Sequence, residues 1–396
     1  MSRRNEPVYL DHQATTPLDE RVLEAMLPYL REEFGNAASR THVYGWRAEA
    51  AVESARERLA EMLGARDPSE IVFTSGATES NNLALLGLAD ASAHPASGPS
   101  ARRSVVTVAT EHPSVLDPCR ALARRGHPVD FLEVDPLGRI PPEAMSRALR
   151  DDTLCVSVMA ANNEIGVVHP IREIAALCRE RGVLLHCDGA QAVGKLELSV
   201  EGDGIDLLSV SGHKLYGPKG VGLLVVRKHG KSRPRLEPRQ YGGGHEGGLR
   251  SGTLPVASIV GLARALELCL AERESETVRL AALRDRLFAE LAAALPGRVI
   301  LNGDPQARLP GNLNVSFEGV DGDRLLADLR GIAVSSGSAC SSALPEPSPV
   351  LLALGRSPAL ARASLRFGLG RSTTPQHVTV AVESVVAAMA RQSPVA

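Results

Sequence analysis

Aromatic residues are scarce in this sequence of 396 residues, where they make up 3% and include a single tryptophan. A hydrophobic core must therefore be built mainly from Leu, Val, Ile and Ala. Opposite charges nearly cancel, because 44 Lys and Arg residues face 46 Asp and Glu residues. This balance gives no sign of a nucleic-acid partner or a membrane-surface partner.

Long apolar segments are missing as well. No segment approaches the ~20 apolar residues that are needed to cross a bilayer, and residues 1–10 hold no apolar stretch of signal-peptide length. None of the six cysteines are spaced C-x-x-C, so a structural zinc site is not expected. These absences together predict a cytoplasmic protein with free thiols and no bound metal.

The middle of the chain alternates short apolar runs with helical patterns. Strands are expected at 71–74, 104–109, 129–133, 154–158, 183–187, 206–210 and 221–226, and helices at 77–89, 114–125 and 171–181. Apolar runs that alternate with helices predict a mainly parallel sheet that is covered on both faces.

The last third of the chain has a different pattern. Residues 257–295 are rich in Ala, Leu and Glu and are expected to be helical, as more than one helix. Further strands are expected at 298–301, 312–317 and 364–367, and further helices at 323–329 and 375–390. The pattern indicates a second, smaller α/β domain after the large one.

A short polar segment that follows the strand 71–74 could bind a phosphate. Ligands of open α/β sheets bind beyond the carboxyl ends of the strands. The segment Ser75-Gly-Ala-Thr-Glu79 opens a helix there, and its small residues let backbone amides approach an anion. Ordinary helix capping by Thr74 or Ser75 is the alternative, and it is the simpler explanation when this segment is taken alone.

Two other strand ends carry groups that suit a ring with an aldehyde. Asp188 follows the strand 183–187 and could pair with a protonated pyridine nitrogen, although a capping Asp is the alternative. Gln191 comes three residues later. Lys214 follows the strand 206–210, within Ser211-Gly-His-Lys214, and could form an imine with an aldehyde. A surface loop is the usual place for a lysine, and it suits the other lysines better, at 195, 219, 228 and 231.

These three weak signals fit one cleft. A carboxylate, an amide and an amine beyond neighbouring strands would surround a ring, and the segment after 71–74 would hold its phosphate. Their order along the chain predicts pyridoxal phosphate (PLP), bound covalently to Lys214.

Motifs from residue 9 to about 370 resemble those of the cysteine desulfurases, which are fold-type I, class V aminotransferase-like PLP enzymes. The motifs are Tyr9-Leu-Asp11, Ala14-Thr-Thr-Pro17, Ile71-Val-Phe-Thr-Ser-Gly-Ala-Thr-Glu-Ser80, Thr110-Glu-His112, Asn162-Asn-Glu-Ile-Gly166, Asp188-Gly-Ala-Gln191, Ser211-Gly-His-Lys214, Gly242-Gly-Gly-His-Glu246, Arg250-Ser-Gly-Thr253, Ser335-Ser-Gly-Ser-Ala-Cys340 and Leu365-Arg-Phe367. The resemblance implies a large PLP-binding domain at 16–258. It also implies a small domain, made of 1–15 and 259–396, that carries a catalytic cysteine loop.

The resemblance implies a role for each residue around the ring. Lys214 would carry the cofactor and move protons at the substrate Cα, and Asp188 would pair with the pyridine nitrogen. Gln191 would hydrogen-bond the ring hydroxyl. His112 would stack on the ring and could assist proton transfer.

Further residues would hold the phosphate and the substrate. Ala77, Thr78, Ser211 and His213 would bind the phosphate, and Thr253 would reach the phosphate in the other subunit of a homodimer. Asn163, which also counts among the cofactor-binding residues, and Arg366 would hold the substrate carboxylate.

Cys340 is the residue that would define the reaction. By the resemblance, its thiolate attacks the sulfur of PLP-bound L-cysteine and yields L-alanine and a persulfide on Cys340. The other cysteines, at 119, 155, 178, 187 and 269, are expected to be small core residues. The segment 335–354 matches the group with a longer cysteine loop, which favours sulfur delivery to an acceptor protein for iron–sulfur cluster assembly or for tRNA or cofactor thiolation.

Departures from the family pattern are few. Ala37 stands where the family often has Pro, and Gly189 stands where it often has Ala. No tail that would dock on a scaffold is recognisable, which leaves the sulfur acceptor undetermined.

Three other functions remain open at this point. An aminotransferase would need a keto acid and no Cys340, and a selenocysteine lyase would prefer selenocysteine to cysteine. A sulfur carrier that keeps only the fold would not bind PLP. The presence of Lys214, Asp188, His112 and Gln191 disfavours that last function.

Overall fold

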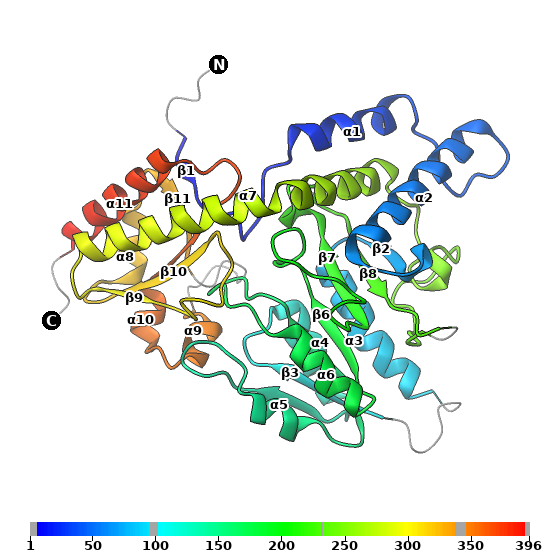
Figure 1. Cartoon of the computed structure of the whole chain (residues 1–396), viewed down its shortest axis with the longest axis horizontal. Coiled ribbons are helices and arrows are strands. Elements are labelled where there is room, and N and C mark those ends of the chain that lie inside the picture. The colour runs from blue at the N-terminus through cyan, green and yellow to red at the C-terminus, as the bar shows by residue number, and fades with distance from the viewer. Residues whose placement is uncertain (1–5, 95–101, 231–232, 337–345, 393–396) are drawn as a thin grey trace.

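A seven-stranded sheet forms the centre of the larger part of the protein (Figure 1). The computed structural model describes residues 6–94, 102–230, 233–336 and 346–392, so Cys340 lies outside the described residues. In spatial order, the strands are β2 (Ile71–Thr74), β8 (Gly222–Val226), β7 (Leu207–Ser211), β6 (Leu184–Asp188), β5 (Thr153–Met159), β3 (Ser104–Val108) and β4 (Val129–Leu132). Among these strands, β8 alone runs opposite to the direction of the others, which confirms the expected mainly parallel sheet.

Helices cover this sheet, and most of them lie where the sequence patterns place them. The helices are α3 (Ala77–Ser92), α4 (Pro113–Arg124), α5 (Pro142–Ala148) and α6 (Ile171–Glu180). Two N-terminal helices, α1 (Glu20–Arg31) and α2 (Val43–Leu63), are absent from the expectations above. The Asp19 side chain caps α1, and Gly64 ends α2 with a positive φ of 69°, so both helices have ordinary boundary signals.

The C-terminal part is built on a smaller, antiparallel sheet. Its strands, in spatial order, are β12 (Ser335–Ser336), β13 (Ser364–Gly368), β10 (Asn312–Phe317) and β9 (Val299–Leu301). A separate pair joins β1 (Val8–Tyr9) to β11 (Ile332–Ala333), so the start of the chain packs on this part. The helices here are α8 (Gly322–Asp328), α9 (Pro349–Ala353), α10 (Pro358–Arg362) and α11 (Pro375–Ala390).

One helix, α7 (Val256–Ala294), connects the two sheets (Figure 1). The expectation of more than one helix here is wrong, because the 39 residues form a single helix. Strong helix formers fill it, and its only glycine, Gly261, stands near the start. Its first half joins the core of the large sheet, and Leu283, Leu287 and Leu291 join the core of the small one. No helix in the described residues is long and apolar enough to cross a membrane.

His169, beside the large sheet, offers a direct test of this packing. Its residue is 4% exposed, and neither ring nitrogen has a hydrogen-bond partner among the described residues. Burial alone lowers the pKa of His169 to about 4 from the ordinary 6.5. Between pH 6.5 and pH 4, His169 is therefore protonated in the unfolded chain and neutral in the folded protein. For this reason His169 lowers the free energy of unfolding as the pH falls through this range.

We expect His169→Leu to remove this cost. Relative to the unmodified protein, the variant should gain about 2 kcal/mol in the free energy of unfolding between pH 8 and pH 5. Denaturant unfolding of both proteins at the two pH values measures the change. The difference between the two proteins at pH 8, where His169 is neutral in both states, gives the effect of packing, and it is subtracted from the difference at pH 5. An equal pH response in both proteins would mean that His169 is solvated.

Candidate active site

A cleft of about 560 Å³ lies at the carboxyl ends of the strands of the large sheet. A cleft of this size is typical of a small-molecule site. The cleft is lined by the predicted residues Ala77, Thr78, His112, Asn163, Asp188, Gln191, Ser211, His213, Lys214 and Arg366. Thr253 is exposed and is not among the residues that line this cleft, and Cys340 lies outside the described residues.

Asp188 ends β6 and is held from two sides. Its Oδ2 accepts a hydrogen bond of 2.7 Å from Asn81 Nδ2, and its Oδ1 accepts one of 2.9 Å from the Ala190 amide. Asn81 lies on α3, is fully buried and also donates to Ser114 Oγ at 2.9 Å. Sequence reasoning missed Asn81, although an amide side chain within the otherwise apolar buried face of a helix is a signal of this kind. The arrangement fixes the direction of the carboxylate in the cleft.

Lys214 ends the short helical turn η3 (Gly212–Lys214) that follows β7. Its Nζ donates to the carbonyl oxygens of Gln13 at 2.5 Å and Ala14 at 2.7 Å. The same N-terminal segment is tied to the turn by Thr16, whose amide and hydroxyl both donate to His213 O at 2.9 Å. Sequence reasoning missed the part played by residues 13–16, which come from the far end of the chain. These contacts hold the amine in place at the floor of the cleft.

The N-terminus of α3 faces the same cleft with its amides free of a side-chain cap. Gly76 is the N-cap, with φ at 151°, and it has no side chain that could cap the helix. Thr74, one of the two capping candidates, instead contacts Ser80 Oγ at 2.8 Å and the Gly76 amide at 3.3 Å. The N-terminal amides of a helix of 16 residues attract an anion.

Backbones approach closely around this helix N-terminus. A Cβ on Gly222 of β8 would lie 2.3 Å from Val210 O and 2.6 Å from Gly76 Cα, so only glycine fits there. Ser211 and His213 line the cleft nearby, and burial, with Lys214 and Lys219, lowers the pKa of His213 to about 4. His213 is therefore neutral near pH 7, and any charge attraction for an anion comes from the lysines and the helix.

Arg366 of β13 forms the side of the cleft that belongs to the small sheet. One terminal nitrogen donates to Asp11 Oδ1 at 2.7 Å and the other to Asn163 O at 3.0 Å. The residue is 2% exposed, and its Nε has no partner among the described residues. A guanidinium in this setting can bind a carboxylate through a two-pronged contact.

Two acids near Arg366 accept hydrogen bonds from Ser335 and Ser348, which stand on either side of Cys340 in the sequence. Ser335 Oγ donates to Asp11 Oδ2 at 2.7 Å, and Ser348 Oγ donates to Glu164 Oε2 at 2.5 Å. Burial raises the pKa of Glu164 to about 7, while Ser348 and Arg366 oppose the rise. Sequence reasoning missed Asp11, Glu164 and Ser348 as parts of this site. Ser335 and Ser348 are therefore each hydrogen-bonded to an acid near Arg366.

His112 precedes α4 and caps it. Its Nδ1 accepts from the Ser114 amide at 3.1 Å and contacts Ser114 Oγ at 2.8 Å, so in the neutral ring the proton resides on Nε2. Burial lowers the pKa of His112, and the charge of Lys214 adds to this, whereas Asp188 opposes it. The ring is therefore neutral and can stack on an aromatic ligand in the cleft.

The five described cysteines are all buried, as expected of small core residues. Burial raises the pKa of each thiol, to about 12 for Cys119 and Cys178. A thiol that stays protonated is a poor nucleophile. None of these five is suited to attack sulfur.

The groups in the cleft suit PLP by their chemistry. The uncapped amides of α3 suit a phosphate, the fixed Asp188 carboxylate suits a pyridine nitrogen, and the Lys214 amine suits an aldehyde. The three groups line one cleft. No cluster of His, Cys, Asp or Glu that could hold a metal ion occurs among the described residues.

Comparisons with known proteins agree on one family. Residues 8–380 match the family "Aminotransferase class-V". The chain is 53% identical over 376 residues to "Cysteine desulfurase IscS" of Anaeromyxobacter dehalogenans (strain 2CP-C), with 95% of this chain and 91% of that protein covered. A solved "NifS-like protein" superposes with a TM-score of 0.88 at 34% identity, over 98% of this chain and all of that one. The structure "SspA in complex with cysteine" superposes with a TM-score of 0.80 at 37% identity, and the match covers 91% of this chain and 98% of that one. The chain therefore belongs to the class-V aminotransferases, which are fold-type I enzymes that use PLP, and within them to the cysteine desulfurases.

Proposed function

We propose that this chain converts L-cysteine to L-alanine and takes up the sulfur on Cys340 as a persulfide. The observation that carries the proposal is the single cleft that joins the Lys214 amine and the Asp188 carboxylate to Arg366. Cys340 lies between Ser335 and Ser348, which are hydrogen-bonded to neighbours of Arg366. The similar structure of SspA in complex with cysteine supports the choice of substrate.

PLP, when bound, supplies an aldehyde that bonds to an amine and a ring that withdraws electrons from the substrate Cα. Lys214 would hold the cofactor and then move a proton at Cα. Asp188, fixed by Asn81, would keep a positive charge on the pyridine nitrogen. His112 would stack on the ring, and Gln191 would donate to its oxygen. Ala77, Thr78, Ser211 and His213, which line the cleft, would bind the phosphate.

Arg366 and Asn163 orient the substrate by its carboxylate, and Asn163 also touches the cofactor. Arg366 is already held by Asp11 and by the Asn163 carbonyl, so its guanidinium group is in position before the substrate binds. This preorganisation lowers the cost of ordering the site.

The sulfur transfer balances without an added oxidant. The Cys340 thiolate forms an S–S bond with the substrate sulfur while the bond between that sulfur and Cβ breaks. The electrons of the broken bond return to the carbon, which is protonated to the methyl group of alanine. Cys340 is left as a persulfide that can pass its sulfur to an acceptor. We place that acceptor in iron–sulfur cluster assembly or in tRNA or cofactor thiolation, in the cytoplasm, where the free buried thiols fit a reducing compartment.

A product assay separates this reaction from its rivals. The purified protein, loaded with PLP and given L-cysteine, is expected to release alanine and, with a reductant, an equal amount of sulfide. An aminotransferase would instead need a keto acid for turnover, and a selenocysteine lyase would turn over selenocysteine preferentially. Alanine formation that depends on an added keto acid would refute the desulfurase assignment.

We further propose that the enzyme is a homodimer whose Thr253 contacts the phosphate bound in the partner subunit. Thr253 is exposed in this chain, and its segment is tied to the phosphate-binding end of α3 by an ion pair of 2.8 Å between Arg250 and Glu79. Exposed aromatic residues lie just after α1 and in the first turn of α2, although aromatics are scarce in the chain. Phe34 stacks on Tyr44 with ring centroids 5.4 Å apart. Phe34 is 68% exposed and Trp46 54% exposed. Such a patch is typical of a protein–protein interface.

Trp46→Glu is expected to raise the dimer dissociation constant at least ~100-fold, because it places a charge in the exposed patch that the proposed dimer would bury. Sedimentation velocity over a range of concentrations measures this change. Val278→Glu is the matched control, since Val278 is 70% exposed on α7, away from this patch. If the Trp46→Glu protein sediments as a dimer like the unmodified protein, Trp46 is not part of the interface.

A further inference from the structure

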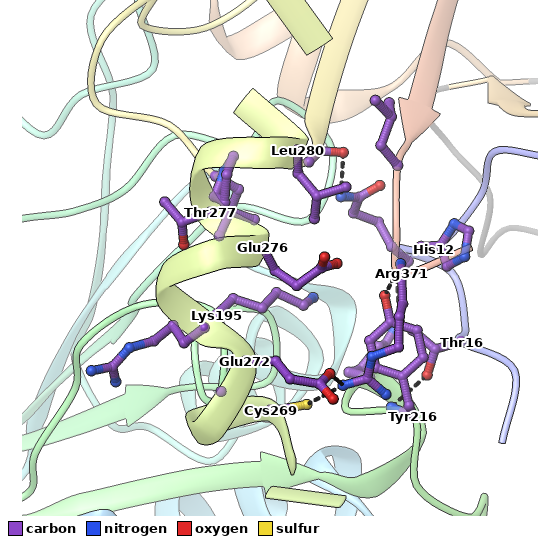
Figure 2. Close-up of a pocket in the computed structure, with 18 residues that line it drawn as sticks. His12, Thr16, Lys195, Tyr216, Cys269, Glu272, Glu276, Thr277, Leu280 and Arg371 are labelled. Atoms are coloured by element: carbon purple, nitrogen blue, oxygen red, sulfur yellow. Dashed lines mark hydrogen bonds and ion pairs between the residues drawn. The ribbon is translucent and has the colours of Figure 1, made fainter. Parts of the chain in front are cut away.

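Lys195 lies behind the cofactor cleft, in a small cavity of about 60 Å³ (Figure 2). The cavity is lined by the turn after β6, by the N-terminal segment, by α7 and by residues 309–311 and 369–371. The expectation of a surface lysine does not hold for Lys195, because the residue is half-buried and its side chain lines this cavity. Burial, with the charge of Lys214, lowers the pKa of Lys195 to about 7. In Figure 2 the side chain extends into the pocket beside the residues of α7.

Lys195 is hydrogen-bonded to an amide of the cofactor site. Its Nζ donates to Gln191 Oε1 at 3.0 Å, and Gln191 Nε2 donates to Gln13 O at 2.9 Å. Lys214 Nζ donates to the same Gln13 carbonyl at 2.5 Å. Gln191 lines the cofactor cleft but not the small cavity, whereas Lys195 lines the cavity but not the cleft. Gln13 and Lys214 line both the cavity and the cleft, but the recorded hydrogen bond of Lys195 toward the cleft is the one to Gln191.

The carboxylates around the cavity have cationic partners of their own. Glu272 pairs with Arg371 at 2.8 Å, and Glu276 pairs with Arg279 at 2.7 Å. The other charged or titratable groups that line the cavity are His12, Lys214, Tyr216, Cys269 and Arg273. Among the described residues, no ion pair within 4.0 Å involves Lys195. Its recorded hydrogen-bond partner is Gln191.

We propose that Lys195 is a positioning residue, which fixes the Gln191 amide with its N–H end toward the cofactor. The proposal rests on the proposed function, in which Gln191 meets the ring oxygen. The opposite amide orientation would set the NH₂ group against the donor Lys195 and the oxygen against the acceptor carbonyl of Gln13. Both contacts would then be repulsive, so the network permits one orientation.

The orientation has a consequence for the proton balance of the cofactor. A donor aimed at the ring oxygen stabilises the deprotonated oxygen, and the charge of Lys195, which is present below its pKa of about 7, acts in the same direction. Both disfavour a further proton on the bound cofactor. Lys195 therefore lowers the pH at which the cofactor loses its proton, without touching the cofactor itself.

A double-mutant cycle tests the proposal on the PLP-loaded enzyme without substrate. The proteins are the unmodified enzyme, Lys195→Met, Gln191→Ala and the double variant, and the readout is the pKa of the visible absorbance of bound PLP. We expect Lys195→Met to raise this pKa by roughly one unit. In the Gln191→Ala background the same change should move it by less than half as much, because only the through-space charge remains.

Equal shifts in both backgrounds, or no shift in either, would overturn the role of Lys195. Lys228→Met is the matched control, since Lys228 pairs with Asp67 outside the cleft and the cavity, and it should leave the titration unchanged. If Lys195→Met does not fold, Lys195→Gln enters the same cycle under the same criterion. A visible PLP band in the unmodified enzyme separates a failure of this proposal from a failure of the proposed function. Absence of that band would contradict both.

Discussion

Lys214→Ala is expected to lose turnover of L-cysteine by at least ~10³-fold and to lose the covalent attachment of PLP. Lys214 is the lysine whose amine is fixed at the floor of the cleft, by the carbonyl groups of Gln13 and Ala14. Its removal takes away both the group that bonds to the aldehyde and the group that moves the proton at Cα.

Borohydride reduction followed by peptide mapping measures the attachment directly. In the unmodified enzyme the cofactor should be trapped on the peptide that contains Lys214, and in Lys214→Ala no lysine peptide should carry it. Lys228→Ala is the control, because Lys228 lies outside the cleft and should keep both attachment and turnover. Cofactor trapped on Lys219, which also lines the cleft, would contradict the assignment.

Cys340→Ala is expected to lose sulfide production by at least ~10²-fold while it keeps the visible absorbance of bound PLP. The substitution removes the acceptor of the sulfur but no group of the cofactor cleft described above. The other thiols cannot replace it, because burial raises the pKa of each of the five.

Cys269→Ala is the matched control for this variant. Cys269 is 6% exposed and borders the cavity behind the cleft, and burial raises the pKa of its thiol, so turnover should persist. Steady-state sulfide assays on both variants decide the matter. A normal rate of sulfide release from Cys340→Ala would show that the nucleophile is another group.

The strands of the large sheet could be predicted because they are short, mainly apolar runs that alternate with helical patterns. The run 71–74 has the bounds of β2, and the strand expected at 206–210 differs from β7 by one residue at each end. The positions of Asp188 and Lys214 then follow from the rule that ligands bind beyond strand ends. Local sequence was sufficient for these features.

Other parts of the site depend on contacts between distant segments, which leave no local signal. Gln13 and Ala14 meet Lys214 across some 200 positions of the chain, and Asp11 meets Arg366 across 355. The burial of Lys195 also depends on contacts with distant segments, and the local sequence gave the wrong expectation for it. A lysine in a turn is usually solvated, but here Lys195 is half-buried and lines a cavity that α7 and the N-terminal segment help to form.

The most direct test of the account is a single turnover with sulfur-labelled L-cysteine, limited to one substrate molecule per PLP. The peptide that contains Cys340 is then analysed by mass spectrometry, and alanine is measured in the same sample. The account predicts alanine and a Cys340 peptide heavier by one labelled sulfur atom, in equal amounts. Alanine without that mass gain, or labelled sulfur on another cysteine, would contradict it.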